Sequence, residues 1–126
     1  MKKIINTKNA PSPIGPYNQA VMVNDTLYVS GQIALNPSTG ELVDSSIEEE
    51  TQQVMKNLQA VLQAADLNFE NIVKTSIFLS DMTLFAKVNE IYGQYFMSDF
   101  PARETVAVKT LPKNVNVEIS AIAVQF

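Results

Sequence analysis

The sequence lacks both cysteine and histidine. Their absence excludes disulfides, thiolate nucleophiles, zinc sites of the usual kind and histidine general bases. The side chains left for chemistry are carboxylates, hydroxyls, eight lysines and a single arginine, Arg103. Nothing in the cysteine usage indicates secretion, and any activity must proceed without the commonest nucleophiles and bases.

Positive charge is also scarce. The 126 residues carry 9 Lys and Arg against 13 Asp and Glu, for a net charge of −4. Nucleic-acid binding requires clustered basic side chains, so this balance argues against a DNA- or RNA-binding surface. Residues 1–11 lack an apolar stretch long enough for a signal peptide, and no segment approaches the length of a membrane span. We therefore expect a cytoplasmic protein with no membrane partner.

The length predicts a single domain over residues 1–126. Turn signals and hydrophobic periodicity predict the order strand, strand, helix, strand, helix, strand, strand. The expected elements are a hairpin around Asn24 and Asp25, a helix from Ser46 to about Asp66, a strand over 72–79, a helix capped by Asp81 or Thr83, a strand near Arg103 and a last strand over about 116–124. Glu49, three residues after Ser46, predicts a capping box.

Residues 10–19 contain three of the six prolines. A mobile N-terminal lead and a stiff loop laid over the domain both fit this composition.

Two helices cover only one face of such a sheet. We expect the other face to carry Val, Ile, Leu and Ala, a larger apolar area than a monomer usually exposes. Because the chain has no further element to cover this face, a second copy of the same protein is the simplest cover. The sequence therefore predicts an oligomer.

Arg103 stands at the start of an apolar strand in the stretch FPARETVAV, residues 100–108. A solvated surface charge there is served equally well by lysine. Arginine is superior where a planar carboxylate is held through two parallel hydrogen bonds. We interpret Arg103 as a carboxylate-binding residue.

Glu118 lies inside the last predicted strand, where glutamate is disfavoured. At a spacing of two residues its face also carries Asn116, Ser120, Ile122 and Val124. Three interpretations remain open: a solvent-facing position, a carboxylate at the rim of a pocket that holds a water or passes a proton, and an ion pair with Arg103 on the consecutive strand.

The predicted second strand of the hairpin contains a glycine, Gly31, on a face with Leu27, Val29 and Ile33. A glycine within a strand indicates a bulge or a close approach of another group to the backbone.

Other polar residues have ordinary structural interpretations as well as functional ones. Tyr17 fits a half-buried tyrosine, Asn89 a helix-surface residue, and Ser30 and Thr105 plain strand residues. Neither hydroxyl has a histidine to activate it, so a serine-hydrolase mechanism is excluded. The stretch SGQIALNPSTG lacks the spacing and the lysine of a phosphate-binding P-loop.

Four segments together resemble the RidA (YjgF/UK114) family: IGPYNQA at 14–20, VSGQIALNPSTGELV at 29–43, FPARETVAVKTLP at 100–112 and VEISAIA at 117–123. The resemblance runs over essentially the whole chain. It implies an α+β, chorismate-mutase-like fold, in which a mixed sheet carries two helices on one face. It also implies a homotrimer whose sheets pack into a central barrel, with clefts between subunits.

The activity implied by the resemblance is hydrolysis of 2-imino acids, such as 2-aminoacrylate/2-iminopropanoate and 2-iminobutanoate, to 2-keto acids and ammonia. Such imines leave PLP-dependent serine and threonine dehydratases and damage other PLP enzymes. The resemblance implies neither a metal nor an organic cofactor. A free imine hydrolyses unaided in water, so holding it beside a placed water suffices for a modest acceleration.

The resemblance also implies roles for individual residues. Arg103 matches the arginine that binds the substrate carboxylate, and Glu118 the glutamate that positions or activates the attacking water. Tyr17 matches the tyrosine that closes the pocket. The positions that line the cleft are Ser30, Gly31, Asn89 and Thr105. The sequence departs from the common family pattern at Asn18 and Ser120, which bears on substrate preference or rate.

Two other functions remain as alternatives: a non-catalytic regulator that binds a metabolite in the same cleft, and an RNA-directed activity attributed to some relatives. The acidic charge balance counts against the second.

Overall fold

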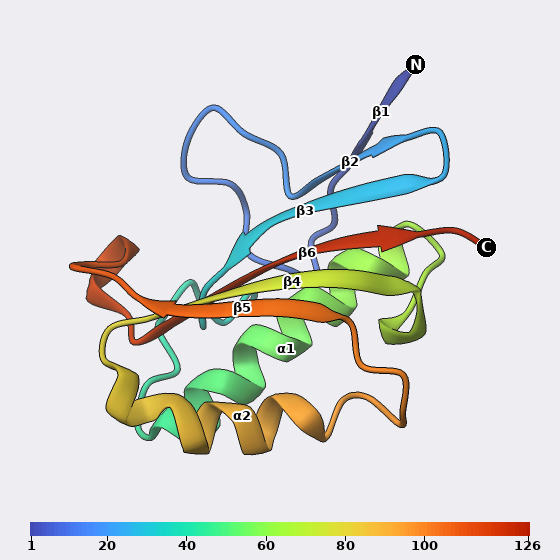
Figure 1. Ribbon diagram of the computed structural model, residues 1–126. Coiled ribbons are helices and arrows are strands. Elements are labelled where there is room, and N and C mark those ends of the chain that lie inside the picture. The colour runs from blue at the N-terminus through green and yellow to red at the C-terminus, as the bar shows by residue number, and fades with distance from the viewer.

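The computed structural model describes all residues from 1 to 126 and contains one six-stranded sheet with two helices on one face (Figure 1). The strands are β1 (Lys2–Ile5), β2 (Ala20–Val23), β3 (Thr26–Gln32), β4 (Ile72–Leu79), β5 (Ala102–Ala107) and β6 (Val117–Val124). The helices are α1 (Ile47–Ala64) and α2 (Phe85–Gly93), with short 3-10 turns η1 (Phe69–Asn71), η2 (Met82–Leu84) and η3 (Pro112–Asn114).

The strand order in the sheet is β1-β2-β3-β6-β4-β5. All neighbouring strands are antiparallel except β4 and β5, which are parallel and are joined through α2. A parallel pair requires such a crossover connection, because a tight turn cannot return the chain to the same end of the sheet. The C-terminal strand β6 therefore lies in the middle of the sheet, and β5 forms one edge (Figure 1).

The other edge is β1, which pairs with β2 and which the sequence pattern did not predict. This strand has only four residues, and its first two are Lys2 and Lys3. Four residues, two of them charged, are too few to show the alternation of apolar and polar side chains that indicates a strand. Lysines on an edge strand also discourage pairing with a further chain, which suits the exposed outer side of β1.

The helix α1 begins where the sequence predicts. Ser46 is its N-cap, and the Ser46 hydroxyl accepts a hydrogen bond from the backbone N–H of Glu49 at 3.1 Å. The predicted capping box is only half formed, because the Glu49 carboxylate accepts a hydrogen bond from the Ser45 hydroxyl instead of the Ser46 backbone. Three glutamates in the first turn lie at the positive end of the helix dipole and favour this start.

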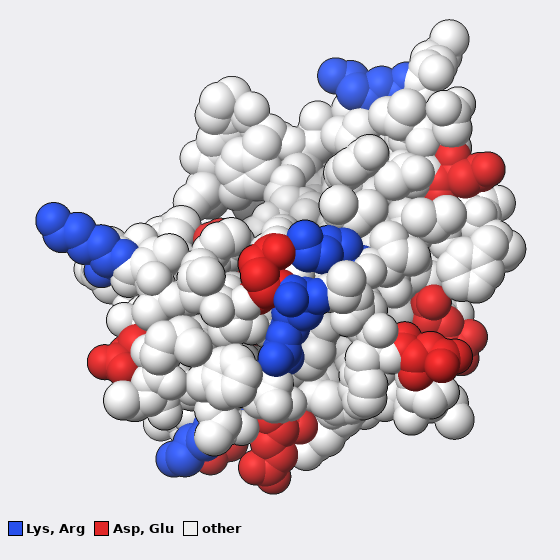
Figure 2. Space-filling model, viewed as in Figure 1, with Lys and Arg blue, Asp and Glu red and all other residues white.

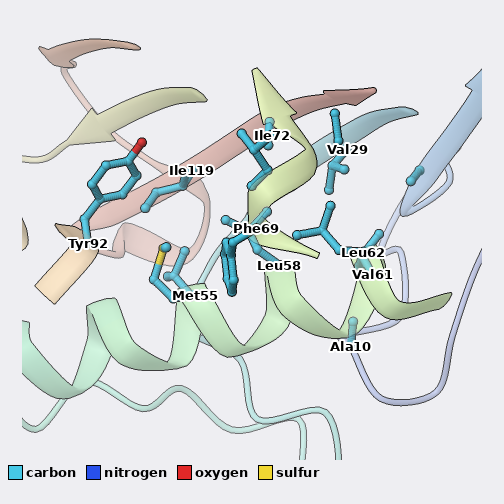
Figure 3. Packing of buried hydrophobic residues seen from close by; sticks show 14 of the residues in the cluster. Ala10, Val29, Met55, Leu58, Val61, Leu62, Phe69, Ile72, Tyr92 and Ile119 are labelled. Carbon is cyan, nitrogen blue, oxygen red and sulfur yellow. The ribbon is translucent and has the colours of Figure 1, made fainter. Parts of the chain in front are cut away.

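The main core lies between the helices and the sheet (Figure 3). The apolar stripe of α1 supplies Met55, Leu58, Val61 and Leu62, which are fully buried against the strands. On β6, Ile119 meets them from the sheet side. Burial of each large side chain contributes roughly 1.5–3 kcal/mol, so this stripe fixes α1 on the sheet.

The opposite face of the sheet is left uncovered. Along β6, burial alternates so that Glu118, Ser120, Ile122 and Val124 are partly exposed on this face, as predicted. The face carries apolar side chains, as expected, but polar and charged side chains also occupy it toward the β5 edge.

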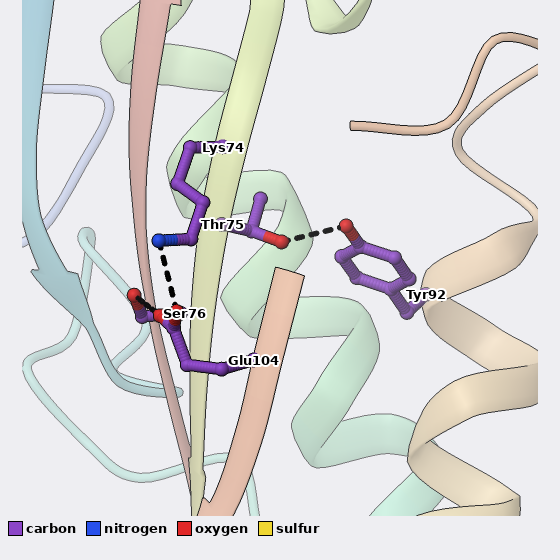
Figure 4. A network of polar contacts seen from close by, with 5 residues as sticks. All are labelled: Lys74, Thr75, Ser76, Tyr92 and Glu104. Carbon is purple, nitrogen blue, oxygen red and sulfur yellow. Dashed lines mark hydrogen bonds and ion pairs between the residues drawn. The ribbon is translucent and has the colours of Figure 1, made fainter. Parts of the chain in front are cut away.

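Toward the β5 edge of the uncovered face, Lys74 Nζ lies 2.8 Å from Glu104 Oε1, and the Ser76 hydroxyl donates to the same carboxylate (Figure 4). These hydrogen bonds lower the pKa of Glu104, with the Lys74 contact as the largest cause. Around this network the face exposes Tyr28, Val73 and Val106. The uncovered face thus carries both a polar network and exposed apolar side chains.

Candidate functional site

Four of the predicted site residues come together at one end of β3 and β6. Glu118, Tyr17, Ser30 and Gly31 line a pocket of about 370 Å³. Its remaining wall is mostly apolar and comprises Pro11, Ser12, Ile14, Gln19, Gln32, Ile33, Leu35 and Pro112. We call this the Glu118 pocket.

Gly31 is at this position because the Glu118 carboxyl lies against its backbone. A Cβ atom at residue 31 would lie 2.8 Å from both Cδ and Oε2 of Glu118, a distance that real Cβ atoms do not show. The pairing of β3 with β6 also shifts register between Val29 and Gln32. The prediction of a bulge or a close approach at Gly31 is confirmed on both counts.

The bulge corrects one detail of the predicted alternation. Gly31 is exposed, whereas Gln32 turns inward and is buried, so Gly31 does not share the inner face of Leu27 and Val29. One extra residue in a strand reverses the side-chain direction for everything that follows. Ser30 and Gly31 are therefore both available to the pocket.

The segment 6–19, which we call the strap, is an ordered loop between β1 and β2 (Figure 1). The buried Gln19 side chain accepts from the Thr7 N–H at 2.6 Å and donates to the carbonyls of Thr7, Ala10 and Pro11. Ser30 ties the strap to β3 by donating its hydroxyl to the Asn18 carbonyl at 2.7 Å. Of the two interpretations of residues 10–19, the stiff loop is the one the structure has.

Tyr17 is carried by the strap. Its hydroxyl accepts a hydrogen bond from the Ile14 N–H at 3.3 Å, and its ring lies against Gly15. The side chain remains 47% exposed, so the ring stands at the mouth of the Glu118 pocket with room to cover a ligand.

The Glu118 carboxyl is half-buried and has no cationic partner. Burial raises the pKa of Glu118 above its ordinary value, because desolvation disfavours the charged form. A carboxyl whose pKa is raised keeps its proton to a higher pH and can therefore serve as a proton donor as well as an acceptor. Of the three interpretations of Glu118, the rim of a pocket describes its place in this chain.

Arg103 lies in a second pocket, between β5 and α2. Its Nη1 donates to Asn89 Oδ1 at 2.6 Å, and its guanidinium carbon lies 5.2 Å from the centre of the Tyr92 ring and 5.6 Å from that of Phe85. Stacking on aromatic rings and a hydrogen bond on one side fix the plane of the guanidinium. Its remaining donors are left for a ligand.

Phe85, Asn89 and Tyr92 are spaced at i, i+4 and i+7 on α2, so all three face the same way. The sequence analysis named neither Phe85 nor Tyr92 as a site residue. The signal that could have found them is their spacing from Asn89. Phe100 and Pro101, which precede β5, complete the lining of this pocket and were also missed.

A hydrogen bond to β4 fixes the position of the Tyr92 side chain. Its hydroxyl shares a 2.8 Å hydrogen bond with the buried hydroxyl of Thr75 on β4 (Figure 4). Burial raises the pKa of Tyr92, while the Thr75 hydrogen bond and the Arg103 charge oppose the shift. The Thr75–Tyr92 bond therefore steadies the ring against which the guanidinium packs.

Thr105 follows Arg103 by two residues and points to the same side of β5. Its hydroxyl oxygen is buried and has no hydrogen-bond partner. The Val108 N–H donates to the Leu79 carbonyl on β4, so by alternation the backbone N–H groups of Arg103, Thr105 and Ala107 point to the free edge. The β5 edge thus combines an arginine, unpaired N–H groups and an orphan hydroxyl.

Arg103 and Glu118 do not meet within one chain. Their strands are consecutive in sequence, but β4 lies between them in the sheet. Arg103 pairs with Thr75, which faces α2, whereas Glu118 pairs with Phe78 on the opposite face. The ion-pair interpretation within a chain is therefore wrong, and the two residues lie in two separate pockets of the chain.

No three acidic side chains gather closely enough to share a metal ion. None of the helices has the length and hydropathy needed to cross a lipid bilayer.

A mixed six-stranded sheet with two helices on one face is the α+β architecture that the sequence predicts. A profile described as "Endoribonuclease L-PSP" matches residues 7–125, and the chain belongs to that family. The resemblance to RidA proteins is confirmed.

Three relatives illustrate the likeness. The human protein named 2-iminobutanoate/2-iminopropanoate deaminase is 49% identical over 125 residues, covering 99% of this chain and 91% of its own length. A Lactococcus lactis protein, provisionally named as the regulator AldR, is 51% identical over 121 residues, covering 96% of each chain. The crystal structure of Escherichia coli TdcF with bound serine superposes with a TM-score of 0.95 at 39% identity, covering 98% of this chain and 99% of that one.

Proposed function

We propose that this protein hydrolyses 2-imino acids, among them 2-aminoacrylate/2-iminopropanoate and 2-iminobutanoate, to 2-keto acids and ammonia. The observation that carries the proposal is the fixed orientation of the Arg103 guanidinium, which is held by Asn89 and by two aromatic rings. The chain is also 49% identical to a protein named for this activity. The activity removes reactive imines released in the cytoplasm by PLP-dependent dehydratases, and thereby protects other PLP enzymes.

The working site is completed between subunits of a homotrimer. In this assembly the uncovered sheet faces close a barrel, and the β5 edge of one subunit adjoins the Glu118 pocket of the next. Three features support it: Arg103 and Glu118 lie on opposite faces of one sheet, the uncovered face exposes apolar side chains, and the Thr105 hydroxyl is buried without a partner. An unpaired strand edge and an uncovered sheet face both call for a covering chain.

In this site the substrate carboxylate accepts hydrogen bonds from the Arg103 guanidinium and from free N–H groups of β5. The imine carbon then lies before Glu118, with Tyr17 across the opening. Glu118 in its neutral form protonates the imine nitrogen, and its carboxylate takes a proton from the attacking water. Oxygen bonds to carbon, the carbon–nitrogen bond of the resulting carbinolamine breaks, and the products are a 2-keto acid and ammonia.

Imine hydrolysis requires only a modest acceleration by the protein. Imines hydrolyse without help, so the site needs to fix the reacting carbon and a water rather than generate a strong nucleophile. Arg103 keeps its charge at any working pH, and Glu118 supplies proton transfer. A pocket without cysteine or histidine is sufficient for such a reaction.

A coupled assay tests the proposal. A threonine dehydratase generates 2-iminobutanoate, which semicarbazide traps as a semicarbazone absorbing in the ultraviolet. The protein should lower semicarbazone formation, and Arg103→Ala should abolish the effect while retaining the fold, since the guanidinium is partly exposed. Equal trapping with wild type and with buffer would reject the enzyme.

Two other outcomes are distinguishable. Saturable stabilisation by 2-keto acids without any change in trapping would favour a metabolite-binding regulator, the role in the name of the Lactococcus relative. Salt-sensitive RNA binding would favour the activity in the family description. The charge argues against RNA: the net charge is −4, and the drawn face intersperses both signs without a continuous basic patch (Figure 2).

A further inference from the structure

Helix α1 carries a row of polar residues at a spacing of i, i+3 and i+7: the buried Glu50 and Asn57, with the partly buried Gln53 between them. Glu50 is fully buried and Asn57 is 1% exposed. Neither contacts the polar groups assigned above to substrate binding. We call this row the polar seam of α1.

Glu50 forms hydrogen bonds with the residues at the start of β6. Its Oε2 accepts hydrogen bonds from the backbone N–H groups of Asn116 at 2.8 Å and Val117 at 3.1 Å, and its Oε1 accepts from Asn116 Nδ2 at 3.0 Å. Glu118 is the next residue along the strand. The Glu50 carboxylate therefore fixes the backbone from which the Glu118 side chain extends.

Asn57 holds a second part of the wall of the same pocket, after the end of β3. Its Nδ2 donates to the carbonyls of Ile33 at 3.0 Å and Leu35 at 2.9 Å. Both residues line the Glu118 pocket just beyond the Gly31 bulge. Gln53 Nε2 donates to Asn57 Oδ1 at 2.9 Å, which orients the amide so that its nitrogen faces the two carbonyls.

The hydrogen bonds made by Glu50 and those made by Asn57 are of opposite kinds. A carboxylate, which only accepts, meets N–H groups at β6, and an amide nitrogen, which only donates, meets carbonyls after β3. A purely apolar α1 would remove these hydrogen bonds from the backbone of both segments, although the Ile33 carbonyl would still accept from the Leu35 N–H at 2.8 Å. One rigid helix thereby spans both walls of the pocket.

We propose that the polar seam of α1 is a positioning device that holds Glu118 and the wall after Gly31 at a fixed separation for the reaction. This inference rests on the proposed imine hydrolysis. Glu50 and Asn57 do not touch the substrate, and they act through β6 and through residues 33–35. A misplacement on the order of 1 Å at a reacting group costs roughly 100-fold in rate, so a small loosening of either wall is visible in turnover.

Glu50→Gln and Asn57→Ala test the two sets of hydrogen bonds separately. Val61→Ala is the matched control, because Val61 is buried on the same helix and lines neither pocket. Each variant is assayed as the full chain for kcat on 2-iminobutanoate and for the Kd of 2-oxobutanoate. Backbone amide exchange is followed over residues 112–120. Thermal melts establish the stability lost by each.

We expect Glu50→Gln to lower kcat by about 10-fold to 100-fold, with the Kd of 2-oxobutanoate within about twofold, because Arg103 holds the carboxylate. Exchange of the Asn116 and Val117 amides should accelerate in Glu50→Gln and not in Val61→Ala. Asn57→Ala should likewise lower kcat while leaving the Kd of 2-oxobutanoate almost unchanged. If Glu50→Gln does not fold, Asn57→Ala still tests the inference.

A kcat loss in Glu50→Gln no larger than in Val61→Ala, at equal loss of stability, would overturn the inference. Unchanged exchange at Asn116 and Val117 would overturn it independently of any activity. An inactive wild type, by contrast, would reject the proposed function itself, while the exchange data still decide whether Glu50 holds β6.

Discussion

Replacing Gly31 by alanine should separate catalysis from stability. The new Cβ would lie 2.8 Å from Cδ and Oε2 of Glu118, whereas ordinary van der Waals contacts fall at 3.4–4 Å. The Glu118 carboxyl must therefore retreat by 0.6–1.2 Å, the difference between these distances. Displacement of a reacting group by about 1 Å costs on the order of 100-fold, so turnover of 2-iminobutanoate should fall by roughly that factor.

The fold should tolerate the same substitution. Gly31 does not have a positive φ, and the atoms that must move are the far end of a flexible side chain. Alanine also restricts the unfolded chain, an effect worth about 0.4–1 kcal/mol in favour of the folded state. Semicarbazide trapping and a thermal melt measure the two effects, with Thr26→Ala at the other end of β3 as the control. Turnover of Gly31→Ala within threefold of wild type would refute the role given to the Glu118 carboxyl.

Three further predictions concern the carboxylate clamp, the pH dependence and the strap. Arg103→Lys keeps the charge but loses the planar fork, and titration calorimetry should show 2-oxobutanoate binding about 10-fold to 100-fold more weakly; unchanged affinity would contradict the clamp. Folding favours protonated Glu118, because burial raises its pKa above 4.5, so the stability from this group is present below that pH and is lost as the pH rises through the folded-state pKa. The Tm of Glu118→Gln should therefore increase relative to that of wild type as the pH rises from below 4.5 through the folded-state pKa of Glu118, whereas a constant difference would contradict the raised pKa. Gln19→Leu breaks four hydrogen bonds of the strap and should cost about 1–3 kcal/mol in urea unfolding, with faster proteolysis within 7–18; unaltered proteolysis would show that the strap is held elsewhere.

The sequence predicts those parts of the fold that depend on local physics. Ser46 begins α1, and the strand over 72–79 has the predicted limits. Asp81, predicted to cap the second helix, caps the 3-10 turn η2 that leads into α2, and α2 itself has no side-chain cap. Each of these features is set by residues within a few positions of one another. The close approach at Gly31 is predicted in the same local way, because a glycine within a strand indicates that some group approaches the backbone closely. The pattern does not indicate that this group is the Glu118 carboxyl.

The arrangement of the site depends on strand order, which local patterns do not determine. Arg103 and Glu118 lie on strands consecutive in sequence, yet β4 separates them in the sheet and they face opposite sides. The mixed character of the uncovered face has a similar origin, because Lys74 and Glu104 meet only after β4 and β5 pair in register. Long-range pairing therefore decides which predicted residues form one pocket.

Subunit complementation tests the central claim that one subunit's Arg103 works with another's Glu118. Arg103→Ala and Glu118→Gln chains, each inactive alone, are mixed, unfolded together and refolded. In a ring of randomly mixed subunits, about one quarter of the sites join an intact Arg103 edge to an intact Glu118 pocket. The account predicts that imine hydrolysis returns to about a quarter of the wild-type rate. No recovery in mixtures that have assembled fully would contradict it.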